Sequence, residues 1–385
     1  MNTITATFDV SRDQDRVDGT ASRQWATRPM DERFATMDDL ITTLRDRTER
    51  STQWTTKLAD LRPVLSDAGT LAFDMVNQRM QLPTNYAFSQ ICAEAGAPAS
   101  YIRKLPDDLA VKCLQYGMKD VDPNREVGVM TTRSNNIAML RALTGPKYGR
   151  IWDLEVAEAV KRMTDESGTR WEVPTAFLRP GQENRAVEVT KESTTLYAGD
   201  RDIFMFLVDQ SRPIEAGLLP DGTPDLYFRG FYAYNGECGG VANGIGTFLY
   251  RYVCMNRNIW GQRGFQKISI RHTANAAARF VSEALPALET FVNGSTAGVV
   301  DGLLAAKRTR IARTDDDRLA FLLGLDFAPK AAATILGRVI DEEGHPAETA
   351  WDFAQGITAF ARSIPHQDER TKIEAAAGKL LAEVA

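Results

Sequence analysis

The chain has 385 residues, 43% of them hydrophobic and 25% charged, which is the balance of a globular protein long enough for two domains. No apolar run approaches the length of a membrane span, and residues 1–15 lack a signal-peptide core, which excludes a membrane protein and predicts a cytoplasmic location. The net charge of −5 argues against a protein coated uniformly with positive charge.

Residues 1–30 are polar and without periodicity, so we expect a flexible N-terminal arm. Residues 31–122 are predicted to form a helical N-terminal region. Apolar spacings of three and four indicate one helix from Met37 to Leu61 with Thr36 as its N-cap, and a second helical block follows from Thr84 to Lys119.

Within that block, residues 88–105 resemble a helix-turn-helix with Gly96 at the turn. If this motif reads DNA, Ser100, Arg103 and Lys104 face the groove. A two-helix corner packed against the protein needs the same small and apolar residues. The nearby acidic residues favour this second interpretation.

Residues 123–273 are predicted to form a β-rich core, interrupted by one helix from Leu154 to Met163. Short, turn-rich connections indicate neighbouring antiparallel strands. The predicted strands are Glu126–Thr131, Ile137–Leu143, Trp171–Leu178, Ala186–Val189, Thr194–Tyr197, Ile203–Val208, Leu226–Tyr234 and Lys267–Arg271.

Residues 274–385 read as a helical C-terminal region of six helices. The whole pattern predicts an α+β fold with a central, mainly antiparallel β-sheet and helical N-terminal and C-terminal regions.

Charge and aromatic residues concentrate in residues 226–272. This segment contains six Lys and Arg residues and a single acid, Glu237, which gives a local charge of +5. It also contains ten of the chain's 33 aromatic residues. Single-stranded nucleic acid binding favours this mixture, because cations contact phosphates while rings stack on bases. We therefore predict a nucleic-acid-binding face, with a basic surface over a floor of tyrosines, composed of Arg229, Tyr232, Tyr234, Arg251, Arg257, Arg263, Lys267, Arg271 and His272. The two-residue period of a strand puts Tyr232 and Tyr234 on one side of residues 226–234 with Phe228, and Arg229 on the other side with Tyr227 and Phe231. The alternative for the rings around Phe248 is the buried stripe of a helix.

The glycine-rich segment from Asn235 to Gly246 follows neither the Walker A nor the dinucleotide-binding pattern. It is read as either a bulged hairpin corner or a loop that approaches phosphates closely. We expect no cofactor and no bound metal, because Cys92, Cys113, Cys238 and Cys254 form no CxxC pair and read as reduced, mostly buried thiols. No pattern identifies catalytic residues.

Several stretches in order resemble the phage- and plasmid-like family called domain of unknown function 932. They are residues 88–106, Met139–Leu143 with Tyr148, Asn235–Gly239, Phe248–Asn256, Ile270–Thr273 and Ala350–Thr358. The resemblance implies residence on mobile genetic elements and brings no established activity.

The leading hypothesis is a DNA-binding accessory protein of a mobile element, for single-strand binding or annealing in recombination, and we expect a homo-oligomer. One alternative is an anti-defence protein that binds a host protein. A further alternative is a metal-dependent nuclease that uses Glu237.

Overall fold

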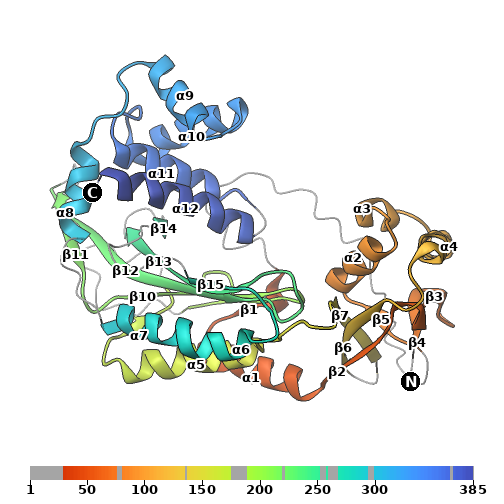
Figure 1. The fold of residues 1–385 in the computed structure, drawn as a ribbon. Helices are drawn as coiled ribbons and strands as arrows, with labels where there is room; N and C mark the ends of the chain where they lie inside the picture. The colour runs from red at the N-terminus through yellow and green to blue at the C-terminus, as the bar shows by residue number, and fades with distance from the viewer. Residues whose placement is uncertain are drawn as a thin grey trace, which may run out of the picture.

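The chain adopts an α+β fold in which a large, mainly antiparallel sheet lies between two layers of helices (Figure 1). A smaller sheet with its own helices extends from one end of the large sheet. The computed structural model describes residues 29–75, 80–134, 137–174, 189–218, 222–251, 257–258, 268–293, 299–364 and 367–384. Within these ranges, no helix is long and apolar enough to span a bilayer.

The N-terminal region begins as predicted and then departs from the helical pattern. The side chain of Thr36 caps α1 (Met37–Glu49) by accepting a hydrogen bond from the Asp39 amide. The helix ends at Glu49, not at Leu61, because the Thr- and Trp-rich segment that follows favours extended backbone. That segment is β2 (Ser51–Lys57), which pairs with β6 (Glu126–Ser134).

Four strands form the smaller sheet, in the order β2-β6-β7-β5, with β7 at Ile137–Thr144 and β5 at Leu82–Pro83. A separate hairpin and three helices pack on it around one hydrophobic core; they are β3 (Leu61–Leu65), β4 (Leu71–Met75), α2 (Asn85–Glu94), α3 (Ala99–Ile102) and α4 (Asp107–Gly117).

The large sheet has the order β1-β9-β10-β12-β13-β14, with β8, β11 and β15 paired beside this path. Its strands are β1 (Arg33–Phe34), β8 (Trp171–Glu172), β9 (Leu196–Ala198), β10 (Ile203–Asp209), β11 (Ile214–Leu218), β12 (Pro224–Asn235), β13 (Asn243–Arg251), β14 (Arg257–Asn258) and β15 (Ile268–Ile270). The segment around Phe248 is therefore a strand, and the helical alternative for it is wrong.

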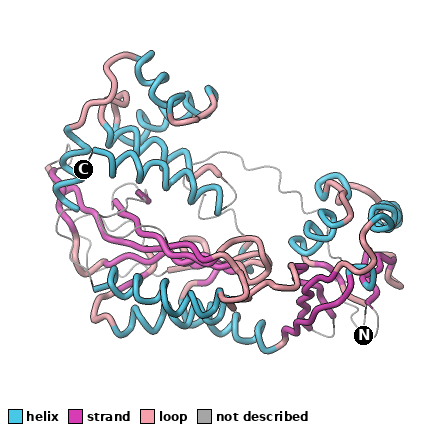
Figure 2. The backbone as a smooth tube through the Cα atoms, in the orientation of Figure 1, coloured by secondary structure: helices cyan, strands magenta, loops and turns pink. Residues whose placement is uncertain are grey.

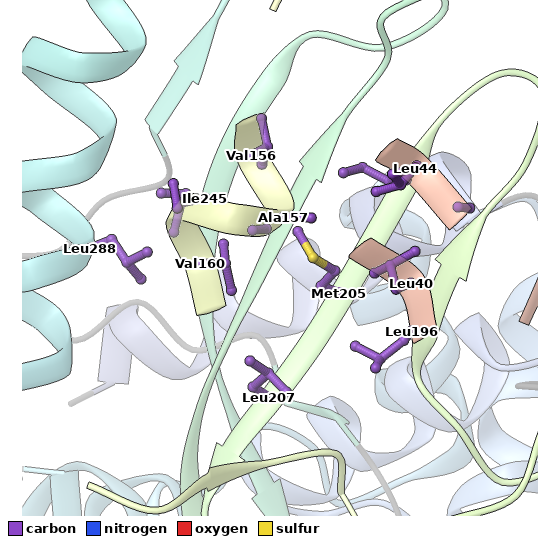
Figure 3. Close-up of a cluster of buried hydrophobic side chains, with 14 of the residues drawn as sticks. Leu40, Leu44, Val156, Ala157, Val160, Leu196, Met205, Leu207, Ile245 and Leu288 are labelled. Carbon is purple, nitrogen blue, oxygen red and sulfur yellow. The ribbon is translucent and has the colours of Figure 1, made fainter. Parts of the chain in front are cut away.

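One face of the large sheet is covered by α1, α5 (Asp153–Glu166), α6 (Ala276–Arg279) and α7 (Leu285–Asn293), with a π-helical turn joining the last two. Figure 3 shows the core that these elements share. Leu40 of α1 and Val160 of α5 gather with Met205 and Leu207 of β10. Every second residue of β10 points into this core, as the two-residue period of a strand requires.

The opposite face carries a cluster of aromatic rings, and the C-terminal helices lie on that side (Figure 2). These helices are α8 (Val299–Arg308), α9 (Asp315–Gly324), α10 (Pro329–Glu343), α11 (Ala350–Ala361) and α12 (Gln367–Val384). Helix α11 is buried on nearly all sides, which explains its almost wholly apolar sequence.

Candidate nucleic-acid interface

Several connections converge at the end of the large sheet that faces the smaller sheet. Residue Ile203 at the start of β10 pairs with Asn235 at the end of β12, and Asn243 at the start of β13 pairs with Ile270 at the end of β15. The glycine-rich segment is the turn between β12 and β13. It is therefore a hairpin corner, as one of the two sequence interpretations expected.

Side chains from the N-terminal half hold this turn through three successive carbonyl groups. Tyr148 Oη donates to the Gly236 carbonyl at 2.8 Å, Arg150 donates to the Glu237 carbonyl, and Gln90 Nε2 donates to the Cys238 carbonyl at 2.9 Å. Gly239 has a φ of +100°, which only glycine adopts without strain. The turn is thus held at three points, with Gly239 exposed and Gly240 half-buried.

Below the turn lies a buried ionic cluster. Glu237 Oε1 is 2.7 Å from Arg141 Nη1 on β7 and 3.4 Å from Arg47 Nη2 on α1. The same Arg47 nitrogen lies 2.7 Å from Asp153 Oδ2, and Asn235 Nδ2 donates to Asp153 Oδ1 at 2.7 Å. These contacts join the two sheets and α1 at one point.

The carboxyl groups of this cluster differ in their affinity for protons. Burial opposes the charge of Glu237, but Arg47 and Arg141 outweigh burial and lower the pKa of Glu237 to about 2. Burial and the neighbouring Glu237 raise the pKa of Asp153 to about 8, against the opposing effects of Arg47 and Asn235. The two pKa values thus shift in opposite directions, so Glu237 is the carboxyl group that carries the negative charge most readily.

Half-buried rings and guanidinium groups surround the outward side of the turn. The guanidinium carbon of Arg150 lies 5.5 Å from the Tyr148 ring centre and 5.6 Å from that of Trp152. That of Arg201, in the turn from β9 to β10, lies 5.9 Å from the ring centre of Tyr86. We call this set, with Gly239, Gly240 and His272, the glycine-loop surface.

The turn touches both groups of rings. A Cβ atom added to Gly240 would lie 2.8 Å from Tyr86 Oη and 2.9 Å from Arg201, and one added to Gly239 would lie 3.9 Å from the Tyr148 ring. The surface is therefore continuous across the turn. The space that a side chain of Gly240 would occupy is thus taken by Tyr86 and Arg201, and glycine lets these groups lie against the backbone of the turn.

His272 completes the surface. Its ring stacks on Tyr148 with centres 4.8 Å apart, and its Nδ1 lies 3.1 Å from the Gly149 carbonyl. Burial lowers the pKa of His272, and the charge of Arg150 adds to this effect. The exposed side chains of Lys147 and Arg271 flank the stacked pair in sequence.

Four residues predicted for the binding face are interior, so the predicted floor and part of the basic surface are wrong. Arg229 is 1% exposed, lies 3.7 Å from Asp209 and packs over Trp171. Arg251 is 6% exposed and contacts Asp225 at 2.8 Å and Glu343 at 2.6 Å. Both cations are neutralised by acids distant in sequence, which local charge counting ignores.

The tyrosines of the predicted face are buried as well. Tyr232 and Tyr234 stack on Phe206 and Phe204, with ring centres 5.5 and 5.4 Å apart. As the alternation of β12 predicted, these rings share the face opposite to Arg229. That face is an aromatic core beneath the C-terminal helices.

The rest of the predicted face is divided. His272 is half-buried at the glycine-loop surface, and Arg271, its neighbour in sequence, is exposed. Arg257 belongs to β14, and only its backbone is described. Arg263 and Lys267 lie outside the described residues.

The helix-turn-helix-like segment forms a packed corner. Helix α3 has only four residues, and Arg103 turns inward, donating at 2.7 Å to the Asn85 carbonyl at the start of α2. Gly96 has a φ of +64°, consistent with its predicted place in the turn. This arrangement favours the corner interpretation over a DNA-reading helix.

Sequence reasoning missed Tyr86, Arg150, Trp152 and Arg201. In residues 148–152, Arg150 lies between two aromatic residues, Tyr148 and Trp152, and next to Gly149. This combination is a local signal for part of this surface. Nothing in the sequence brings Tyr86 or Arg201 to the same place, because each comes from a different connection.

Cys92 and Cys238 are buried free thiols, and burial raises the pKa of Cys238 to about 12. Among the described residues, no group of three or more His, Cys, Asp and Glu side chains is arranged to hold a metal ion.

Comparison with known proteins adds no further constraint, since no family model, curated protein or solved structure matches this chain.

Proposed function

We propose that this chain is a nucleic-acid-binding accessory protein of a phage or plasmid, which holds single-stranded DNA at the glycine-loop surface during recombination. The observation that carries the proposal is the pairing of Arg150 and Arg201 with half-buried rings on both sides of the turn, whose outer residues Gly239 and Gly240 bear no side chains. The mobile-element setting rests on the family resemblance alone.

The geometry favours a single strand. Unpaired bases expose their flat faces, so they can pack against the half-buried rings of Trp152 and Tyr86, which lie 5.6 and 5.9 Å from a guanidinium carbon. The bases of a duplex are stacked on one another. On a duplex these rings would find no exposed base faces, so only the cations would contribute, by contacting phosphates.

Charge supports an anionic partner. Beneath the turn, the guanidinium groups of Arg47 and Arg141 offset the two carboxyl groups of Asp153 and Glu237, and Arg150 on the outward side of the turn adds a further cation. At the rim, Asp200 accepts a hydrogen bond from the Tyr86 amide at 3.0 Å, so this acid is held by the fold. Among the described residues, no carboxylate lies within ion-pairing distance of the exposed cations Lys147 and Arg271.

A nuclease that uses Glu237 fits less well. Oxygen Oε1 of this carboxylate contacts two guanidinium groups, and Oε2 accepts a hydrogen bond from the Asp153 amide at 3.0 Å. A divalent ion at either oxygen would have to displace these partners.

The proposal is tested by fluorescence anisotropy with labelled single-stranded DNA, duplex DNA and single-stranded RNA over a range of salt concentrations. Wild type should prefer single strands, with affinity falling steeply as salt rises. The double variant Lys147→Glu with Arg271→Glu should bind more weakly. Its log–log salt slope should be shallower by about 0.7 for each phosphate that the variant no longer neutralises.

The matched control carries the same charge change elsewhere, with Arg308→Glu and Lys330→Glu on exposed positions of α8 and α10. Its affinity should stay close to that of wild type. Absence of binding to every polymer at low ionic strength would overturn the proposal. Equal losses of affinity in the two double variants would reject the glycine-loop surface as the site.

A further inference from the structure

The glycine-loop surface continues beyond the turn along the start of α2. Tyr86, beside Gly240, is the second residue of α2, and the carbonyl of its neighbour Asn85 accepts a hydrogen bond from Arg103. Arg103 also donates to Ser89 Oγ, and its guanidinium packs 5.1 Å from the ring centre of Phe88. The backbone at the start of α2 and the contacts of Arg103 therefore connect the turn to the end of α3.

At that end, α3 presents a ring to solvent and the turn that follows it presents a cation. Tyr101 is 59% exposed, and Lys104, whose amide donates to the Tyr101 carbonyl at 3.0 Å, is also exposed. In the part of the chain that the structure describes, no carboxylate pairs with Lys104. The acids that follow are engaged elsewhere, since Asp107 accepts from the Leu71 amide at 3.0 Å and Asp108 lies 3.9 Å from Lys112.

These features suit a single strand better than a duplex. A four-residue helix is too short to lie along a major groove and present several side chains to base edges. An exposed tyrosine with a lysine beside it needs only one unpaired base and one phosphate.

We propose that a single strand bound at the glycine-loop surface runs along the first turn of α2 and stacks a base on Tyr101, with Lys104 contacting an adjacent phosphate. This inference rests on the proposed function and extends it to a second contact point. It assigns a binding role to the corner that resembles a helix-turn-helix.

Oligomer length separates this second contact from the first. Oligothymidylates of about 4 and about 16 nucleotides span the usual range of site sizes for one binding fold. The Tyr101→Ala variant should bind the long oligomer about 5–150-fold more weakly than wild type, the range for removal of one base–ring stack. Binding of the short oligomer should change little.

The matched control is Tyr116→Ala. Tyr116 is 71% exposed on α4, and Lys119 lies 5.4 Å from its ring centre, so this pair has the same chemistry away from the path. Its affinity for both oligomers should equal that of wild type. Lys104→Gln should make the salt slope for the long oligomer shallower by about 0.7, while leaving the short one unchanged.

Wild-type affinity of Tyr101→Ala for the long oligomer would overturn this inference and leave the proposed function standing. Equal losses of affinity in Tyr101→Ala and Tyr116→Ala would also overturn it. Failure of wild type to bind any oligomer would remove the proposed function, and this inference with it. Both tyrosines are exposed, so thermal unfolding should show all variants folded.

Discussion

The buried carboxylate of Glu237 joins its own turn to two other segments of the chain. It contacts Arg141 of the smaller sheet and Arg47 of α1, and it is 1% exposed. Replacing Glu237 by Gln keeps the size of the side chain and leaves two guanidinium groups without their anion. Breaking a buried pair costs about 3–5 kcal/mol of unfolding free energy, and we expect the low end, because Asp153 can then ionise beside Arg47.

Chemical denaturation of wild type and Glu237→Gln measures this difference. The lowered pKa of Glu237 adds a signature in acid, because its contribution exists above pH 4.5 and disappears as the pH falls from 4.5 towards about 2. Between pH 4.5 and about 2, the unfolding free energy of the variant should therefore fall less than that of wild type. Glu283→Gln is the control, since Glu283 pairs with Arg279 at the surface, where water weakens an ion pair, and its replacement should leave the unfolding free energy nearly unchanged. Equal effects of the two changes would contradict the assigned role of Glu237.

Among the elements, β13 depends on glycine where it passes the rings of β12. A Cβ atom added to Gly246 would lie 2.4 Å from the Tyr232 ring, and Tyr232 is held by Phe206 in a buried stack. The strand therefore needs a residue without a side chain at this position. Helix α10 differs, because Gly337 has no atom within 4 Å of its added Cβ.

The same substitution should accordingly act in opposite directions in these two elements. Gly246→Ala should destabilise the fold by about 1–3 kcal/mol through overpacking. Gly337→Ala should stabilise it by about 0.5–1 kcal/mol, because alanine is the better helix former. Thermal unfolding of the two variants checks the prediction. If Gly246→Ala left the unfolding temperature unchanged, the Tyr232 ring would have to be free to move.

At the scale of the molecule, the C-terminal helices are joined to the large sheet through Asp225 of β12. Its carboxylate contacts Arg251 of β13 at 2.8 Å and Lys307 of α8 at 2.6 Å, and Arg251 also reaches Glu343 of α10 at 2.6 Å. Burial opposes the charge of Asp225, but Arg251 and Lys307 prevail and lower its pKa. This network, together with the core around Trp351, attaches the helical layer to the sheet.

Asp225→Asn should therefore loosen that layer. We expect a loss of about 3 kcal/mol of unfolding free energy, because Lys307 then lacks a buried anion while Arg251 keeps Glu343. Hydrogen exchange should rise in α8 and β11 more than in α5 on the other face. The control is Asp341→Asn on α10, where the pair with Arg338 is long and exposed. Uniform exchange throughout the chain would show that the layers unfold as one unit.

Local pattern was sufficient for much of this architecture. The alternation in β12 correctly separated Tyr232 and Tyr234 from Arg229, and Thr36 was correctly identified as a helix cap. The antiparallel central sheet and the C-terminal helices followed from turn chemistry and helical spacing. These features depend on residues a few positions apart, so the sequence alone contains them.

Tertiary structure decided which charges and rings reach solvent. Arg251 is neutralised by Glu343, and Arg47 by Asp153, across separations of 92 and 106 residues. The positive charge counted between residues 226 and 272 is therefore partly interior, and the candidate interface uses Arg150 and Arg201 from other connections. Burial and ion pairing depend on partners that folding brings together from distant parts of the chain, so no window of sequence specifies them.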